Sequence, residues 1–94
     1  FECDSVTLEE PIDVHFAKSG RYIVEVEFTS PLTSLAQIAI NLNIDKAGAC
    51  TLVSKGTDGT IGVAKTSISV MNWAKQLKIS SKADVSIKSV KFLM

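Results

Sequence analysis

The stretch Gly20-Arg21-Tyr22-Ile23-Val24-Glu25-Val26-Glu27-Phe28 decides the fold class. Every second residue from Tyr22 to Phe28 is aromatic or β-branched, and the residues between them are charged, apart from Ile23. Successive side chains of a strand point to opposite faces, so this period of two places the apolar residues together on one face. Such residues also pack well on a half-buried sheet. The stretch therefore predicts a strand with one wet and one buried face, which is typical of antiparallel sheets.

The same alternation recurs at short intervals between turn signals such as Asp58-Gly59. It predicts strands at 1–8, 12–16, 20–28, 36–44, 49–54, 61–63, 66–70, 75–79 and 84–92, with 61–63 and 66–70 either separate or one bent strand. In the last strand the apolar spacing slips by one between Ile87 and Val90, which predicts a bulge near Lys88-Ser89. Eight or nine short strands indicate an all-β, two-sheet antiparallel β-sandwich that forms one domain over residues 1–94.

Composition restricts the partners. The chain has 94 residues, 46% of them hydrophobic, which is enough for one core. Ten basic and ten acidic residues give a formal net charge of zero, so no net positive field of the kind that nucleic acid binding needs is present. Acidic residues gather near the N-terminus and lysines in the C-terminal half, which indicates charge complementarity within the fold or, alternatively, a polyanion-binding face. No apolar run approaches the roughly 18 residues of a membrane span, so we expect no membrane insertion.

The two cysteines, Cys3 and Cys50, leave two alternatives open. If they are bonded, the closed loop stabilises the fold by roughly 4 kcal/mol in the idealised treatment. If they are reduced, each is a small buried hydrophobic side chain. The chain begins at Phe1, so we expect either a mature secreted product, in which the cysteines are bonded, or a module from a longer protein.

Catalysis is not expected from the residue types. His15 is the single histidine and lies on the wet face of a predicted strand. Glu25 and Glu27 share one face of one strand, whereas glycosidase carboxylates face each other across a cleft. The glycines from Gly56 to Gly62 lack the Lys-Ser/Thr ending of a phosphate loop, and no Gly-x-Ser-x-Gly elbow is present. We therefore expect a protein without catalytic residues, cofactor or metal.

The order of strands and turns resembles that of galactose-binding-like jelly rolls, in particular the carbohydrate-binding modules of families 6 and 35. The shared features are an acidic opening strand, Gly20 and Tyr22 at the start of the alternating strand, an aliphatic strand that ends in Asn43, and a bulged last strand. Val70 and Leu77 match the aliphatic positions of the closing hairpin. The resemblance covers nearly the whole chain, and it implies a jelly roll that binds carbohydrate without catalysis.

Three departures from these modules concern ligands. Many of the modules hold a structural calcium between an acid of the opening strand and an Asp of the closing strand, where this chain has Glu2 and Lys88. A cation at a metal-ligand position repels the metal, so the resemblance implies no calcium site here and a Lys88–Glu2 ion pair in its place. The paired Trp of the modules is replaced by Thr60-Ile61-Gly62-Val63, and their Asn before the closing strand is missing from 81–84.

Carbohydrate binding needs a stacking aromatic residue, together with amides or hydroxyls placed for the sugar hydroxyls, and two groups of residues offer parts of this chemistry. The first is a predicted turn that contains Trp73, the single tryptophan, between Asn72 and Lys75. Its indole either projects toward a ligand or covers the end of the sandwich. The second group is a row of amides on the wet face of one strand, formed by Gln37, Asn41 and Asn43.

These patterns predict a secreted or extracellular, non-catalytic β-sandwich that binds an oligosaccharide or glycoconjugate, as a lectin or an appended module. Because aromatic residues are few, we expect weak binding at each site and a gain from repeated copies or oligomers. The alternative is a structural or cell-adhesion module that binds a protein partner through its strand edges or Trp73.

Overall fold

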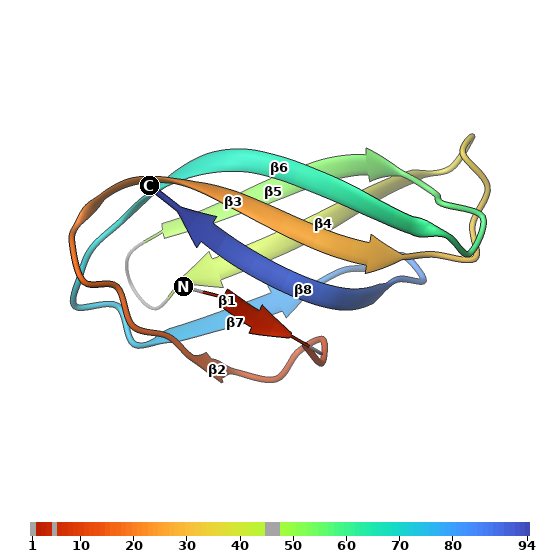
Figure 1. Ribbon diagram of the computed structural model, residues 1–94. Helices are drawn as coiled ribbons and strands as arrows, with labels where there is room; N and C mark the ends of the chain where they lie inside the picture. The colour runs from red at the N-terminus through yellow and green to blue at the C-terminus, as the bar shows by residue number, and fades with distance from the viewer. Residues whose placement is uncertain (1, 5, 45–47) are drawn as a thin grey trace.

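The alternating stretch forms strand β3 (Gly20–Thr29), an inner strand of the first of two sheets (Figure 1). The computed structural model describes residues 2–4, 6–44 and 48–94. The first sheet has the order β1-β8-β3-β6 and the second the order β2-β7-β4-β5. The remaining strands are β1 (Glu2–Asp4), β2 (Ile12–Asp13), β4 (Gln37–Ile44), β5 (Gly48–Lys55), β6 (Ile61–Val70), β7 (Gln76–Ser80) and β8 (Ser86–Leu93).

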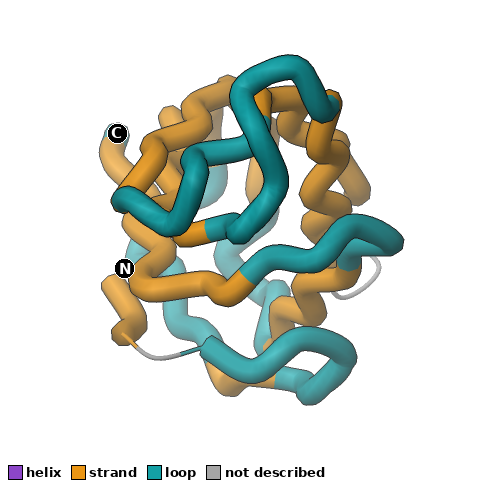
Figure 2. The backbone as a smooth tube through the Cα atoms, turned by 90° about the vertical axis from the view of Figure 1, so that its right-hand side faces the viewer, coloured by secondary structure: helices purple, strands orange, loops and turns teal. Residues whose placement is uncertain are grey.

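The strand order is that of an eight-stranded jelly roll. Only β4 and β5, which are consecutive in the chain, are also neighbours in one sheet. Every other connection between described strands crosses from one sheet to the other, and Figure 2 shows the two layers from one end. The predicted all-β, antiparallel two-sheet sandwich is confirmed, and the described residues build no helix that could cross a bilayer.

The strand boundaries differ from the prediction in three main places. Of the described residues in the strand predicted at 1–8, only Glu2–Asp4 form β1, because the chain turns at residues 8–9. The segments predicted at 61–63 and 66–70 form the single strand β6, which pairs with β3 along its full length. The second predicted strand shortens to Ile12–Asp13, although Val14 and Phe16 still point into the core. The predicted bulge is confirmed, because Glu27 pairs with Ser89 and Phe28 with Ile87, which leaves Lys88 without a partner in β3.

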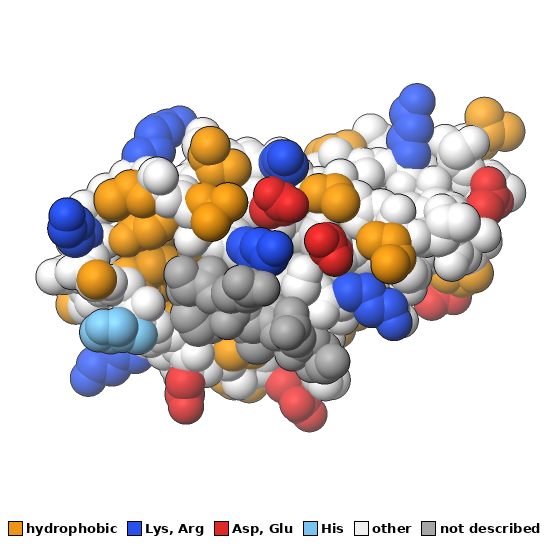
Figure 3. Space-filling view, viewed as in Figure 1, with side chains coloured by type: hydrophobic (Ala, Val, Ile, Leu, Met, Phe, Trp, Pro, Cys, Tyr) orange, Lys and Arg blue, Asp and Glu red, His pale blue; other side chains and the backbone are white. Residues whose placement is uncertain are grey.

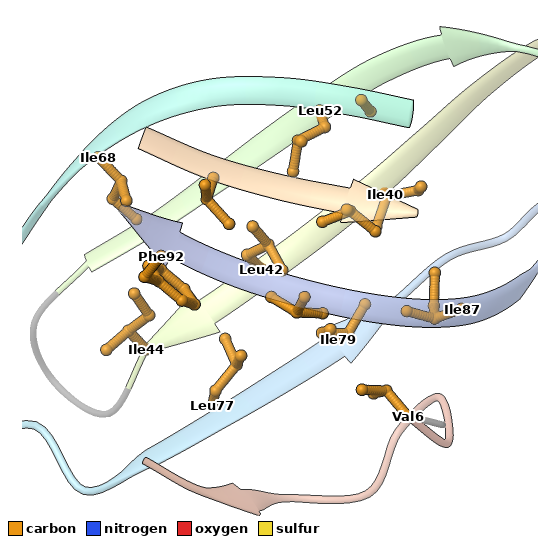
Figure 4. Close-up of a cluster of buried hydrophobic side chains, with 14 of the residues drawn as sticks. Val6, Ile40, Leu42, Ile44, Leu52, Ile68, Leu77, Ile79, Ile87 and Phe92 are labelled. Atoms are coloured by element: carbon orange, nitrogen blue, oxygen red, sulfur yellow. The ribbon is translucent and has the colours of Figure 1, made fainter. Parts of the chain in front are cut away.

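The core lies between the inner faces of the two sheets (Figure 4). Val24, Val26 and Phe28 of β3 are fully buried, and they face fully buried aliphatic residues of β4 and β7 such as Leu42 and Leu77. At one end, Phe16, Tyr22 and Phe92 pack edge to face, with ring centroids 5.1–6.5 Å apart. The Tyr22 hydroxyl donates a hydrogen bond of 2.7 Å to the Lys18 carbonyl, so its one polar atom is satisfied.

The bonded alternative for Cys3 and Cys50 fails on topology. Strand β1 is the edge of one sheet and β5 is the edge of the other, on opposite sides of the sandwich (Figure 1). Cys50 has a free thiol, whereas the side chain of Cys3 lies outside the described residues. The backbone register also differs from the one that a Lys88–Glu2 ion pair would need, because Glu2 stands opposite Lys91 and not opposite Lys88. The side chain of Glu2 likewise lies outside the described residues.

Candidate functional site

The predicted amide row lies on the outer face of the β4 sheet. Along β4 the aliphatic side chains point into the core and the alternate positions point outward, with Gln37 and Asn43 exposed and Asn41 half-buried. On the neighbouring strand, Thr51 stands opposite Asn41, and its hydroxyl donates a hydrogen bond of 2.8 Å to Asn41 Oδ1. The side-chain NH₂ of Asn41 is therefore the part of this amide that is left to donate to a ligand.

An open hollow of about 490 Å³ lies beside β4, lined by Gln37, Ala39, Asn41, Lys82 and Ala83. It exists because β7 pairs with β4 only as far as Ser80, which stands opposite Asn41, so the first residues of β4 have no strand on that side. The β7–β8 loop forms the far wall. Ser81 fixes that loop, since its hydroxyl donates 2.8 Å to the Ala39 carbonyl and accepts 3.2 Å from the Ala83 backbone.

A second open hollow of about 400 Å³ lies on the other side of Gln37. It is lined by the loop residues 34–36 and by Gln37, Val53, Ser54 and Lys55. Its surface is partly aliphatic, because Leu35 is 96% exposed and Val53 is 59% exposed. Gln37 lines both hollows, so we call the two together the Gln37 groove.

Ser30 anchors the loops that form the walls of the Gln37 groove. It is only 1% exposed, and its hydroxyl donates 2.7 Å to the Asp84 carbonyl and accepts 3.2 Å from the Leu32 backbone. Its own backbone N–H and C=O bond Thr57 Oγ1 at 2.8 and 3.0 Å. One buried serine therefore joins the β3–β4, β5–β6 and β7–β8 loops.

Trp73 lies in the turn from Met71 to Ala74, which is closed by a backbone hydrogen bond of 3.0 Å between those two residues. Its side chain is 50% exposed, whereas Ala74 is buried, so Ala74 and not the indole covers the core there. Of the two alternatives, the structure thus shows the projecting one. Asn72 and Lys75 are also exposed, and the Asn72 backbone N–H donates 2.8 Å to Ser19 Oγ.

The two predicted groups do not form one site. The turn with Trp73 follows β6 at the end of the sandwich where β3 begins, while Gln37 lies at the other end, where β4 begins (Figure 1). Sequence reasoning found the amide row but missed Lys55, Lys82, Leu35 and Ser30, which share its surface or hold its loops. Only the outward alternation of β5 signalled Lys55.

Within the described part of the chain, no three His, Cys, Asp or Glu side chains come together as a metal site. The expectation that the protein does not bind calcium stays a prediction, because the side chain of Glu2 lies outside this part.

Comparisons with known proteins bear on the fold alone. No family model and no curated protein matches the chain. A solved structure that does match is the crystal structure of a novel β-glucosidase from Paenibacillus barengoltzii, with a TM-score of 0.78 and 20% sequence identity. The match covers 99% of this chain and 10% of that one. The chain therefore shares the fold of a small part of a much longer enzyme.

Proposed function

We propose that the chain is a non-catalytic domain that binds carbohydrate in the Gln37 groove. The observation that carries the proposal is an open surface in which amides and aliphatic groups lie side by side. Gln37 and Asn41 supply donors and acceptors for sugar hydroxyls, and Leu35 and Val53 supply apolar contact for the C–H faces of a ring. No aromatic residue lines either hollow, so we expect weak binding per site that repeated copies strengthen.

The absence of catalysis and the extracellular location are parts of this proposal. No carboxylate and no histidine lines either of the two hollows, so they offer no pair of groups for acid–base cleavage of a sugar. The β-glucosidase with the matching fold acts on glycosides by its description, and this chain corresponds to 10% of its length. That relation supports the role of an appended domain that holds a carbohydrate near an enzyme or a surface.

The proposal is tested by titrating the protein with a panel of soluble oligosaccharides and comparing three variants. Gln37→Ala should lower the affinity several-fold, because it removes an amide that lines both hollows. Asn41→Asp keeps the acceptor for Thr51 but loses the NH₂ donor, so it should also weaken binding. The control is Asn43→Ala, which lies in the same row but lines neither hollow. The proposal fails if no saccharide binds, or if only the Asn43 variant loses affinity.

A second candidate function, binding of a protein partner, is favoured by an apolar surface at the end of the sandwich where β3 begins. Ile23 and Leu93 are cross-strand partners on the outer face of the β3 sheet, and both are half exposed. Exposed Met71, Trp73 and Met94 lie at the same end, and Figure 3 shows hydrophobic side chains gathered there. Under this alternative Leu93→Asp would abolish association with a partner, whereas the Gln37 variant would leave it intact.

A further inference from the structure

Two lysines stand on either side of Gln37. Lys55 is the β5 residue opposite Gln37 and lines the hollow that contains Leu35. Lys82 belongs to the β7–β8 loop and lines the hollow that contains Asn41. Lys55 lies on the flank of β4 that pairs with β5, and Lys82 lies on the flank that β7 leaves open. Both lysines line hollows that share Gln37, so their positive charges act on the same groove.

Within the described residues, neither of these two lysines has a carboxylate partner. Neither one makes an ion pair with a residue that the structure describes, in contrast to Lys65, which pairs with Glu25 at 3.7 Å, and Lys78, which pairs with Glu9. No carboxylate lines either hollow. Asp58 and Asp84, the acidic residues of the neighbouring described loops, lie outside both linings.

The formal net charge of the chain is zero, so a positive groove is a local feature and not a consequence of overall basicity. Sites for single-stranded nucleic acid combine positive charge with aromatic side chains on which bases stack. The linings of the two hollows contain amides, hydroxyls and aliphatic groups instead. This composition favours a sugar that carries anionic groups over a nucleic acid.

We propose that the Gln37 groove recognises an acidic polysaccharide, with carboxylate or sulfate groups held between Lys55 and Lys82 and the sugar hydroxyls bound by the amides of Gln37 and Asn41. This inference rests on the proposed function and specifies its ligand class. Carboxylate and sulfate present the same chemistry to a lysine. Each is a small anionic group on the sugar ring, with several oxygen atoms that accept hydrogen bonds.

The test uses two pairs of polymers, and the members of each pair share a sugar backbone and differ in whether it carries anionic groups. Polygalacturonate is compared with its methyl-esterified form, and dextran sulfate with dextran, by calorimetric titration in about 50 mM and about 500 mM salt. The variants are Lys55→Gln, Lys82→Gln and the double substitution. The control is Lys65→Gln, which makes the same change of charge on the other sheet, where Lys65 pairs with Glu25. Melting curves confirm that each variant is folded.

At least one charged polymer should bind more tightly than its neutral partner, and the advantage should shrink at high salt. Each groove substitution should cost about 2–5-fold in affinity, as exposed ion pairs usually contribute, and the control should change nothing. If the charged form binds more tightly than the neutral form in only one of the two pairs, that pair identifies the anion as carboxylate or sulfate. Equal binding of the charged and neutral forms overturns this inference and leaves the proposed function standing. Failure of all four polymers to bind overturns this inference, whereas the proposed function fails only if the oligosaccharide panel shows no binding either. Equally tight, lysine-dependent binding of a dT oligonucleotide shows a general polyanion site and overturns the inference as well.

Discussion

Replacing Ser30 by alanine should unfold the protein at a markedly lower temperature, although it removes one oxygen atom. The Ser30 hydroxyl is buried and bonds the Asp84 carbonyl at 2.7 Å and the Leu32 backbone N–H at 3.2 Å. Alanine fills nearly the same volume, so the loss is one of hydrogen bonding. Asp84 is exposed and Leu32 is half-buried, so water can reach both groups that lose their partner, and the cost is that of two lost hydrogen bonds.

The expected cost follows from these two partners. An ordinary hydrogen bond contributes a net of about 1 kcal/mol, so we expect the loss of two in Ser30→Ala to lower the free energy of unfolding by about 2 kcal/mol. For a domain of this size about 1 kcal/mol lowers Tm by roughly 4–8 °C, so the expected drop is roughly 8–16 °C. The groove should also bind ligand less tightly, because two of the loops that Ser30 joins form its walls.

The assay is urea unfolding followed by circular dichroism, with Ser69→Ala as the matched control. Ser69 is exposed on β6, and substitutions of that kind usually change stability by less than about 0.5 kcal/mol. If Ser30→Ala costs no more than Ser69→Ala, then the Ser30 hydroxyl does not hold the loops together, and the account of the groove walls is wrong.

Three further substitutions test other parts of the structure. Gly56→Ala should destabilise the protein far more than Gly59→Ala, because a Cβ at Gly56 would collide with the backbone carbonyls of Leu32 and Thr33. A Cβ at Gly59 would meet open space, and only its φ of +82° would be strained. Equal losses of stability in thermal melts would contradict this. Because the Trp73 side chain is half exposed, Trp73→Ala should lower the free energy of unfolding by less than half of the about 3–5 kcal/mol expected for Phe28→Ala. Acrylamide should also quench the fluorescence of Trp73. A loss of stability comparable to that of Phe28→Ala would mean that the indole is packed in the core. Burial raises the pKa of the Cys50 thiol above its ordinary 9.0, so the folded chain keeps a proton that the unfolded chain releases. The stability of the protein should therefore fall as pH rises above 9.0, and by more than the stability of Cys50→Ala does. Identical pH profiles of the two proteins would show that the thiol is not buried.

Local patterns were sufficient to predict the sandwich. The alternation from Tyr22 to Phe28 predicted the inner strand, and the slip between Ile87 and Val90 located the bulge, because both follow from which side chains must face the core. The continuity of β6 was less visible. Its large residues Ile61 and Val63 point outward, while Gly62 and Ala64 point inward. A Cβ at Gly62 would lie 3.1 Å from the Phe28 ring, so small residues are needed opposite it.

The groove was less predictable, because it depends on contacts between distant residues. The outward alternation of β4 predicted that Gln37 and Asn41 face solvent, and the strand predicted at 75–79 ends close to the end of β7 at Ser80, but nothing local shows that β7 pairs with β4 and leaves their flank open. Ser30 is separated from Asp84 by 54 residues and from Thr57 by 27. A polar residue at the end of a strand normally marks a turn, so its role as the joint of three loops could come only from the folded structure.

The central claim is that the Gln37 groove binds a sugar, and an NMR titration of the ¹⁵N-labelled chain tests it most directly. Oligomers of galacturonic acid and their methyl esters would be added while the backbone and side-chain amide signals are followed. We predict saturable shifts of the side-chain NH₂ signals of Gln37 and Asn41 and of the backbone signals of Lys82 and Ala83. Shifts confined to the turn around Trp73, or no shifts at any residue, would contradict the claim.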